Sequence, residues 1–269
     1  MIRLVVTDID HTLYNPKTKG ISKRNIDAIS KLQQKGIHVI LASGRVLQGM
    51  KQIINLLDII QPLDYIIVNN GAEIYEVNGY SKIKDFPISV EEISDFVNIA
   101  KEIGVNFSIC QDEYTLTTGL DKYIEYDYYN VGIDLYWVHD IFSKVGKPIY
   151  RCSFTGDVEK IIELEKKMKN EFGHRYFFNI PHPGYLDVSL LHVNKALAIV
   201  EIAKSLGISN NEIACIGDAD NDVPMLKLAG ISGCVGNGSA NAKASATYVV
   251  DSCEDDGFAK FIETYILGE

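Results

Sequence analysis

Short apolar runs alternate with amphipathic stretches along the first and last thirds of this 269-residue chain. Residues 2–6 are mostly apolar and predict a buried strand of a parallel sheet. Four later apolar runs follow the same plan, and each ends in polar residues: 36–42, 65–68, 213–216 and 231–235. Amphipathic stretches between them predict helices over 22–35, 46–57, 194–206 and 221–229. This rhythm predicts an α/β fold with a Rossmann-like parallel sheet.

The stretch 22–35 shows how the helices are delimited. Apolar residues at Ile26, Ile29 and Leu32 form one stripe at helical spacing. Ser22 is a candidate N-cap, and Gly36 is a stop signal. The segment therefore predicts a helix that buries a single face.

The middle of the chain departs from this rhythm. Residues 73–84 alternate around Asn78-Gly79, which predicts a hairpin. Helices are then expected over 89–103, 121–130 and 157–172, and strands over 105–110, 114–118, 149–155, 175–179 and 185–191. We expect an inserted α/β cap domain over 83–186, with the core formed by 1–82 and 187–269.

Two aspartates, Asp8 and Asp10, appear where the first strand should end. Ligands bind at the carboxyl ends of strands in open α/β sheets. Close carboxylates repel each other unless a cation, a proton or hydrogen bonds compensate them. The pair suits a metal site with a nucleophilic or acid–base carboxylate, but on this segment alone a solvated Asx turn explains it equally well.

The other apolar runs also end in chemically useful groups. They lead into Ser43-Gly44-Arg45, Asn69-Asn70-Gly71, Gly217–Asp222 and Gly236-Asn237-Gly238. If these strands are parallel neighbours, all their polar ends gather on one edge of one sheet. That edge would hold carboxylates, a hydroxyl, amides and glycines, which suits a metal and a phosphate.

The sequence resembles haloacid dehalogenase-like (HAD) hydrolases of the Cof type, with a type IIB cap. The family pattern is DxDx[TV][LV], a Ser or Thr after the second strand, a lone Lys, and GDxxND. It appears here as Asp8–Leu13, Ser43, Lys195 and Gly217–Asp222. Further matches lie at Asn70-Gly71-Ala72, Val235-Gly236-Asn237 and Asp255–Ala259. The resemblance covers 1–82 and 187–269 and is much weaker between them.

The resemblance implies catalytic roles for three residues. Asp8 would attack a phosphate monoester and form an aspartyl-phosphate. Asp10 would protonate the leaving alkoxide and then activate water. Lys195 would neutralise charge on the phosphoryl group and on Asp8, although a lone lysine at a helix start is more often a surface residue.

The resemblance also implies a Mg²⁺ site. The ligands would be the carboxylates of Asp8 and Asp218 and the main-chain carbonyl of Asp10, with Asp222 supporting them through water or from outside the ligand set. The alternative is a helix N-cap cluster, which explains one aspartate but not the whole group. Asp220 occupies a variable position and is expected to be solvated.

Phosphate binding is assigned to four positions. Ser43 would hydrogen-bond a phosphoryl oxygen, with the Gly44 N–H close by. Asn70 or its neighbour Asn69 would reach the substrate, although Asn-Gly is also a plain turn signal. Asn221 would bind phosphate or orient the nucleophile. Arg45 would contact substrate or brace the site.

Two positions depart from the family pattern. His11 stands where glycine usually follows the second aspartate, and Ala196 stands where glycine usually follows the lysine. Both leave the reactive atoms in place but put the local backbone in question, and His11 can also alter the pH profile.

The composition of the chain limits the kinds of molecule that it is expected to bind and the compartment in which it is expected to work. The net charge of −10 argues against nonspecific binding to nucleic acid or to an anionic membrane. The five cysteines form no CxxC motif, which favours reduced thiols in a cytoplasmic protein. No apolar run approaches the length of a membrane span, and Asp8 and Asp10 interrupt any signal-like segment.

The sequence thus predicts a Mg²⁺-dependent hydrolase acting on small phosphorylated metabolites, with sugar phosphates favoured by the family. It would be a monomer or a weak homo-oligomer. The alternatives are a phosphomutase that uses the same aspartyl-phosphate and a noncatalytic ligand-binding relative.

Overall fold

A computed structural model describes residues 1–269 except 58, 60–62, 112–113, 126–133 and 147. The chain forms two compact units. The core unit comprises Met1–Arg45, Met50–Asp85 and Asn194–Glu269. The cap unit comprises Phe86–Val193 together with Val46–Gly49. Each unit has its own sheet.

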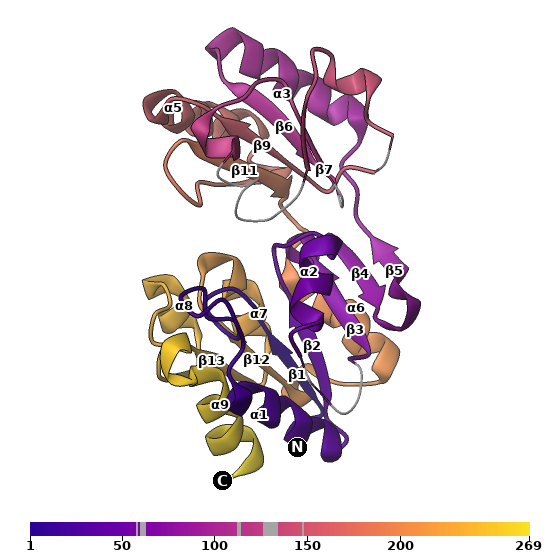
Figure 1. The fold of residues 1–269 in the computed structure, drawn as a ribbon, viewed down its shortest axis with the longest axis vertical. Helices are drawn as coiled ribbons and strands as arrows, with labels where there is room; N and C mark the ends of the chain where they lie inside the picture. The colour runs from indigo at the N-terminus through magenta and orange to yellow at the C-terminus, as the bar shows by residue number, and fades with distance from the viewer. Residues whose placement is uncertain (58, 60–62, 112–113, 126–133, 147) are drawn as a thin grey trace. The chain divides into compact units, whose positions relative to one another are not determined.

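The sheet of the core unit has the order β14-β13-β12-β1-β2-β3-β4-β5 among the described residues (Figure 1). Its strands are β1 (Leu4–Thr7), β2 (His38–Ala42), β3 (Tyr65–Val68), β4 (Glu73–Glu76), β5 (Ser81–Asp85), β12 (Ile213–Gly217), β13 (Ile231–Cys234) and β14 (Tyr248–Val249). The strands from β14 to β3 are parallel, and β4 and β5 add an antiparallel edge. The predicted α/β fold with a parallel sheet is confirmed.

Helices cover both faces of this sheet, which is why its central strands are apolar throughout. The helices of this region are α1 (Lys23–Gln34), α2 (Leu47–Ile54), α6 (Lys195–Leu206), α7 (Val223–Leu228), α8 (Ala240–Ser245) and α9 (Gly257–Phe261). Apolar residues of α6, α7 and α8 share a buried cluster with Leu4, Val6 and Ile40. In Figure 1, α1 and α9 lie side by side near the two termini. The chain ends in a π-helical turn, Ile262–Leu267.

Helix α1 follows its sequence signals closely. Ser22 is the N-cap, and its side chain accepts a hydrogen bond from the Asn25 N–H. Ile26, Ile29 and Leu32 are buried, as the spacing predicts. Each such side chain contributes roughly 1.5–3 kcal/mol when fully buried, so this stripe is what fixes the helix to the sheet.

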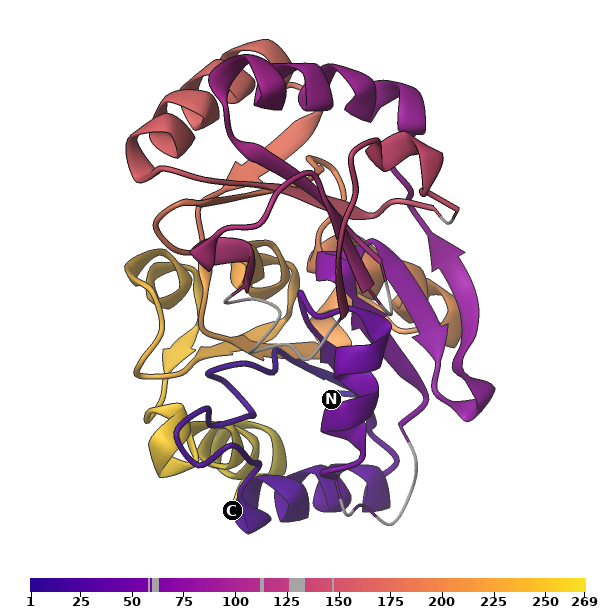
Figure 2. The ribbon, with the colours of Figure 1, turned by 45° about the horizontal axis from the view of Figure 1, so that its top comes forward.

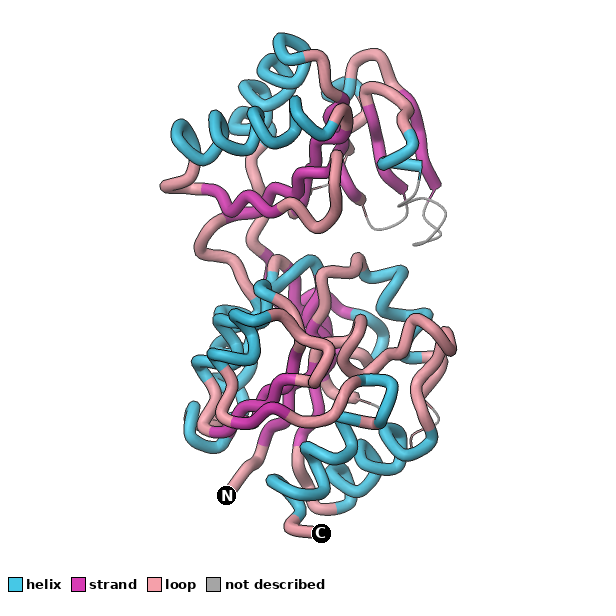
Figure 3. Tube along the Cα trace, turned by 90° about the vertical axis from the view of Figure 1, so that its left-hand side faces the viewer, coloured by secondary structure: helices cyan, strands magenta, loops and turns pink. Residues whose placement is uncertain are grey.

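The cap unit is built on a second sheet with the order β10-β11-β9-β6-β7-β8. Its strands are β6 (Asn106–Cys110), β7 (Tyr114–Thr117), β8 (Asp134–Trp137), β9 (Arg151–Thr155), β10 (Tyr176–Asn179) and β11 (Tyr185–Leu190). These strands are antiparallel except for the pair β7–β8. Helices α3 (Val90–Ile103) and α5 (Val158–Phe172) lie together on one side of it (Figures 2 and 3).

Aromatic rings pack against one another within the core of the cap unit. Phe96 of α3 packs within 6.2 Å of Phe154 and 5.0 Å of Tyr176, measured between ring centroids. Phe154 and its neighbour Cys152 point to the helices, so Arg151 and Ser153 point to the opposite face of the sheet.

The observed boundaries differ from the expected ones. The predicted break at 82/83 would cut β5, which pairs with β4 and ends at Asp85. The predicted break at 186/187 would cut β11, which pairs with β9 and β10. The two units instead divide at 85/86 and 193/194, because strands that are hydrogen-bonded to each other belong to the same unit.

Two further elements differ from expectation. No strand was predicted at β8, which is short and lies at the edge of its sheet. The helix predicted over 121–130 lies partly outside the described residues, because 126–130 are not among them.

Of the helices that the structure describes, none combines the length and the apolar character needed to cross a bilayer.

Candidate active site

The carboxyl ends of neighbouring parallel strands bring the candidate residues together. Asp8 follows β1, Ser43 follows β2, Asn69 follows β3, and Asp218 follows β12. These four strands are consecutive in the sheet, in the order β12-β1-β2-β3. The expectation that their polar ends share one edge is therefore confirmed.

An acidic cluster with one buried lysine lies at this edge. One carboxylate oxygen from each of Asp8, Asp218 and Asp222 lies within 4.8 Å of the others. Lys195 is fully buried, and its Nζ pairs with Asp8 and with Asp222 Oδ1, the latter at 2.6 Å. Asn194 caps the helix that Lys195 begins, so the lysine is held at a fixed point.

Burial dominates the electrostatics of this cluster. It raises the pKa of Asp8 well above its ordinary value; Lys195 opposes this, and Asp222 and Asp218 add to it. Burial lowers the pKa of Lys195, but Asp222 and Asp8 outweigh it and raise that pKa. Burial and then Asp222 raise the pKa of Asp218 to about 6. One lysine thus leaves the negative charge only partly compensated.

Asp222 differs from the other two aspartates because both of its oxygens already accept hydrogen bonds. Oδ1 accepts from Lys195, and Oδ2 accepts from the N–H groups of Asp218 and Ala219 at 2.9 and 3.0 Å. Thr12, also buried, donates to Asp218 Oδ1 at 3.1 Å. Asp222 thus orders the turn that presents Asp218.

The cluster suits a divalent cation. Hard cations such as Mg²⁺ prefer carboxylate oxygens and retain several waters, so they need few protein ligands. Asp8 and Asp218 offer oxygens here, and a cation would favour their charged forms against the burial and the repulsion from Asp222 that raise the pKa of both. The residues present therefore fit the predicted metal.

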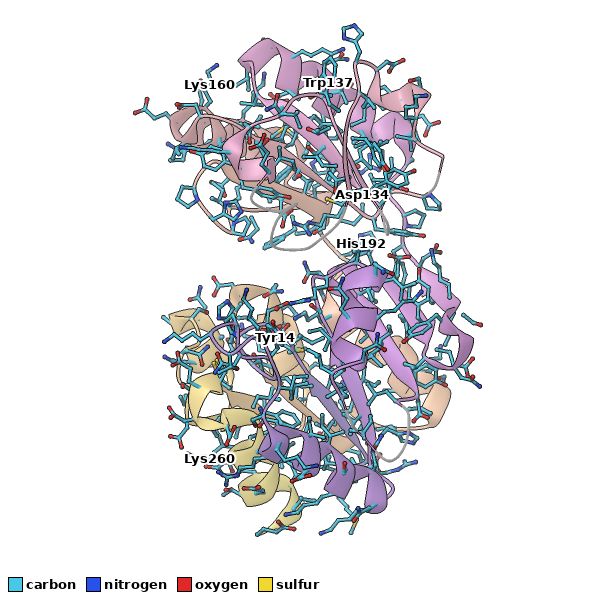
Figure 4. The ribbon with its side chains drawn as sticks, viewed as in Figure 1. Tyr14, Asp134, Trp137, Lys160, His192 and Lys260 are labelled. Atoms are coloured by element: carbon cyan, nitrogen blue, oxygen red, sulfur yellow. The ribbon has the colours of Figure 1, made fainter. Side chains whose placement is uncertain are left out.

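Asp10 makes a different contact. Its carboxylate forms a two-pronged pair with Arg45, with Nε–Oδ2 at 2.8 Å and Nη2–Oδ1 at 2.6 Å. The Arg45 guanidinium also lies 5.5 Å from the ring centroid of Tyr14, labelled in Figure 4. Arg45, which the sequence left between two roles, therefore braces Asp10 in this structure.

The predicted phosphate-binding residues form a connected group. The Asn221 amide donates to Asn70 Oδ1 at 2.9 Å. A Cβ at Gly44 would lie 3.1 Å from the Asn70 amide, so glycine allows this close approach. Ser43 is buried, and its Oγ accepts from the Arg45 N–H at 3.1 Å. A hydroxyl retains donor capacity, which is what an anionic oxygen requires.

The two departures from the family pattern have local explanations. His11 adopts a left-handed backbone with φ of 62°, and its carbonyl accepts from Asn237 Nδ2 at 2.8 Å. Histidine is among the non-glycine residues that take this conformation more readily. Ala196 lies inside α6, where alanine favours the helix more than glycine would.

Sequence reasoning assigned no role to Thr12, Asn237 or the side chain of Asp220. Thr12 lies within the DxDx[TV][LV] motif, so the motif itself could have identified it as a site residue. Asp220, expected to be solvated, is exposed but accepts from Ser239 Oγ at 2.5 Å and from Asn241 Nδ2 at 2.9 Å. It therefore contacts the start of α8 rather than joining the acidic cluster.

Residues 5–262 match the family of haloacid dehalogenase-like hydrolases. The chain belongs to this family. A Bacillus subtilis relative, 5-amino-6-(5-phospho-D-ribitylamino)uracil phosphatase, is 26% identical over 266 residues, covering 99% of this chain and 96% of the relative.

Solved structures agree with this membership. A haloacid dehalogenase-like hydrolase from Bacteroides thetaiotaomicron superposes with a TM-score of 0.88 at 26% identity, covering 98% of this chain and 99% of that one. A second structure from that organism, described among phosphatases of the HAD superfamily, gives 0.84 at 25% identity, covering 98% and 95%. This HAD hydrolase thus shares its fold with them along nearly its whole length.

Proposed function

We propose that this HAD hydrolase is a Mg²⁺-dependent phosphatase that cleaves small phosphate monoesters through an aspartyl-phosphate on Asp8. One observation carries the proposal: Lys195, fully buried, lies between Asp8 and Asp222 at the edge where the parallel strands end. Burying a charged cluster is costly, and a phosphoryl-transfer site makes use of it.

In the first step, a carboxylate oxygen of Asp8 attacks phosphorus as the bond to the leaving oxygen breaks, and Asp10 gives that oxygen a proton. In the second step, water attacks phosphorus and returns a proton to Asp10. The bond between phosphorus and Asp8 then breaks, which releases inorganic phosphate and restores both carboxyl groups.

Charge stabilisation comes from fixed groups. Lys195 Nζ faces the Asp8 oxygen and would balance charge that develops during transfer. Ser43 and Asn70 would hold the phosphoryl oxygens. Asp8 and Asp218 would hold Mg²⁺ together with the Asp10 carbonyl, and the bound ion would supply positive charge to the phosphoryl group.

The Arg45 contact adds a requirement. A carboxylate held by a guanidinium fork only accepts hydrogen bonds, whereas the first step needs Asp10 to donate one. We infer that at least one of the two hydrogen bonds between Arg45 and Asp10 breaks before Asp10 acts as an acid. A substrate oxygen that accepts a hydrogen bond from Arg45 in place of Asp10 would accomplish this.

The substrate class rests on the relatives and on the cap unit. The B. subtilis relative is named as the phosphatase of a phosphorylated ribitylamino-uracil. We propose a small phosphorylated metabolite, such as a sugar phosphate or a related compound, with the cap unit selecting the leaving group. Hydrolysis is favoured over return of the phosphoryl group, because this relative is named a phosphatase.

The test is release of inorganic phosphate from a panel of sugar phosphates, phosphorylated ribitylamino-uracil and p-nitrophenyl phosphate. We expect several members to be hydrolysed with Mg²⁺ and none after exhaustive chelation. Asp8→Asn serves as the matched control for contaminating phosphatases. Release that persists in Asp8→Asn, or no release from any member, would overturn the proposal.

A further inference from the structure

A buried carboxyl group lies outside the acidic cluster. Glu73 on β4 is fully buried, and three donors face it. Its Oε2 accepts from Asn69 Nδ2 at 2.7 Å, and its Oε1 accepts from Tyr75 OH at 2.7 Å and pairs with Lys82 Nζ at 2.8 Å. A carboxylate accepts without donating, so this set of neighbours matches its charged form.

Glu73 holds a turn of unusual conformation. Asn69, Asn70 and Gly71 have consecutive positive φ values of 49°, 55° and 102°. Asparagine enters this region more readily than most residues, but three consecutive positive φ values persist only where the surroundings hold them. Asn69 Oδ1 is buried and accepts no hydrogen bond from the described residues, so the bond to Glu73 is what fixes this amide.

The same turn touches the proposed active site at three points. The Asn69 and Asn70 N–H groups donate to the carbonyls of Arg45 and Ser43, each at 2.9 Å. Asn70 Oδ1 accepts from Asn221. The third point is Gly71, which packs against the start of α6.

A Cβ on Gly71 would lie only 2.2 Å from the Asn194 carbonyl oxygen. Gly71 therefore packs directly against the residue that caps α6 and precedes Lys195. A shift of the turn would move both the Asn70 amide and the start of the helix that carries the lysine.

We propose that Glu73 is a positioning residue of the phosphoryl-transfer site, acting through Asn69 and the left-handed turn. This rests on the proposed phosphatase function and extends it to a residue on a neighbouring strand. The turn contacts groups that would bind the phosphoryl group, which all substrates share. Loss of the Glu73–Asn69 bond should therefore affect every substrate alike.

Three variants test this. Glu73→Gln places an amide where donors converge and weakens the hold on Asn69. Glu76→Gln makes the same change at an exposed position on the same strand and is the matched control. Combining Glu73→Gln with Asn69→Asp exchanges donor and acceptor, so the new amide donates to the new carboxylate while the total charge stays that of the wild type.

We expect Glu73→Gln to lower kcat/KM by about 100-fold for each of three substrates, the scale of a small misplacement at a reacting centre. It should also weaken binding of inorganic phosphate in the presence of Mg²⁺. Glu76→Gln should leave both unchanged, and the double variant should recover most of the loss even if Glu73→Gln alone folds poorly. Unchanged kinetics in Glu73→Gln, or no recovery in the double variant, would overturn the proposal.

A second readout separates this inference from the proposed function. The backbone amide resonances of Asn70 and Gly71 should shift in Glu73→Gln and return in the double variant, whether or not any phosphate ester is cleaved. If the resonances behave so while the wild type hydrolyses nothing, the phosphatase proposal fails and the positioning contact stands. If the resonances do not move, the positioning role is wrong.

Discussion

The two units of this HAD hydrolase bury different kinds of polar side chain. Among the described residues, the buried charged side chains all belong to the core unit: Asp8, Glu73, Lys195 and Asp222. The buried polar side chains of the cap unit are neutral: Ser108, Gln111, Thr117, Ser153 and Thr155.

The difference indicates where chemistry takes place. A buried charge destabilises a fold unless it is paired, and a hydrophobic replacement often stabilises it, whereas a buried hydroxyl needs only one partner. The core unit keeps four such charges within or next to one strand edge. This distribution supports the proposal that phosphoryl transfer takes place in the core unit, and the proposed selection of the leaving group by the cap unit needs a separate test.

The largest effect is expected at the nucleophile. Asp8→Asn keeps the volume of the side chain but removes its nucleophilic oxygen, so turnover should fall by at least about 1,000-fold. Circular dichroism and thermal unfolding should show a folded protein. A purified, folded variant with substantial activity would remove Asp8 from the mechanism and the chemistry from this cluster.

Metal dependence sharpens the same assignment. EDTA should abolish activity, and Mg²⁺ should restore it. Asp218→Ala should raise the Mg²⁺ concentration needed for half-maximal activity by roughly 10–100-fold, because it removes one of the two carboxylate ligands proposed here. Glu76→Ala, at an exposed position, serves as the control. Activity that survives exhaustive chelation contradicts the proposed site.

A kinetic comparison of the units tests the division of labour. Lys195→Ala should lower kcat for every substrate by a similar factor, since its charge is used in a transition state that they share. Arg151→Met alters the face of the cap sheet opposite α3 and α5, where Arg151 pairs with Asp187 at 2.7 Å, and should change the ratios of kcat/KM between substrates. The comparison needs at least three substrates. If Lys195→Ala changes the order of substrate preference and Arg151→Met does not, the proposed roles of the two units are wrong.

The smallest effect concerns stability without metal. The pKa of Asp218 is raised to about 6 by burial, so between its unfolded value and pH 6 the folded state binds more protons than the unfolded state. The free energy of unfolding therefore falls as pH rises through this range. In EDTA, Asp218→Asn should be more stable than the wild type by about 1–3 kcal/mol at pH 7, and this gap should close near pH 4. Equilibrium urea unfolding at both pH values measures the difference in the free energy of unfolding between the two proteins. A difference that does not change with pH would contradict this prediction.

Much of this architecture follows from local signals. Apolar runs predicted the parallel strands, and Ser22 and the burial of Ile26, Ile29 and Leu32 agree with the predicted helix α1. Gly104, left-handed at the end of α3, is where that helix was expected to stop. These features depend on neighbours in sequence, so a single chain reveals them.

The features that the sequence did not reveal depend on contacts between distant segments. The ion pair between Arg45 and Asp10 connects two loops, and the proposed role of Glu73 depends on its hydrogen bond with Asn69, which forms only when β4 pairs with β3. Strand β8 lies at a sheet edge and depends on pairing with β7. The unit boundaries follow strand pairing, which composition does not report.

The central claim is that phosphate passes through Asp8. The most direct measurement uses Asp10→Asn with p-nitrophenyl phosphate, whose leaving group departs without a proton while the second step still lacks its base. The account predicts a burst of p-nitrophenol stoichiometric with enzyme, and borohydride reduction of the quenched protein should convert residue 8 to homoserine, detectable by mass spectrometry. Steady release with no modification, or modification of a different residue, would contradict the account.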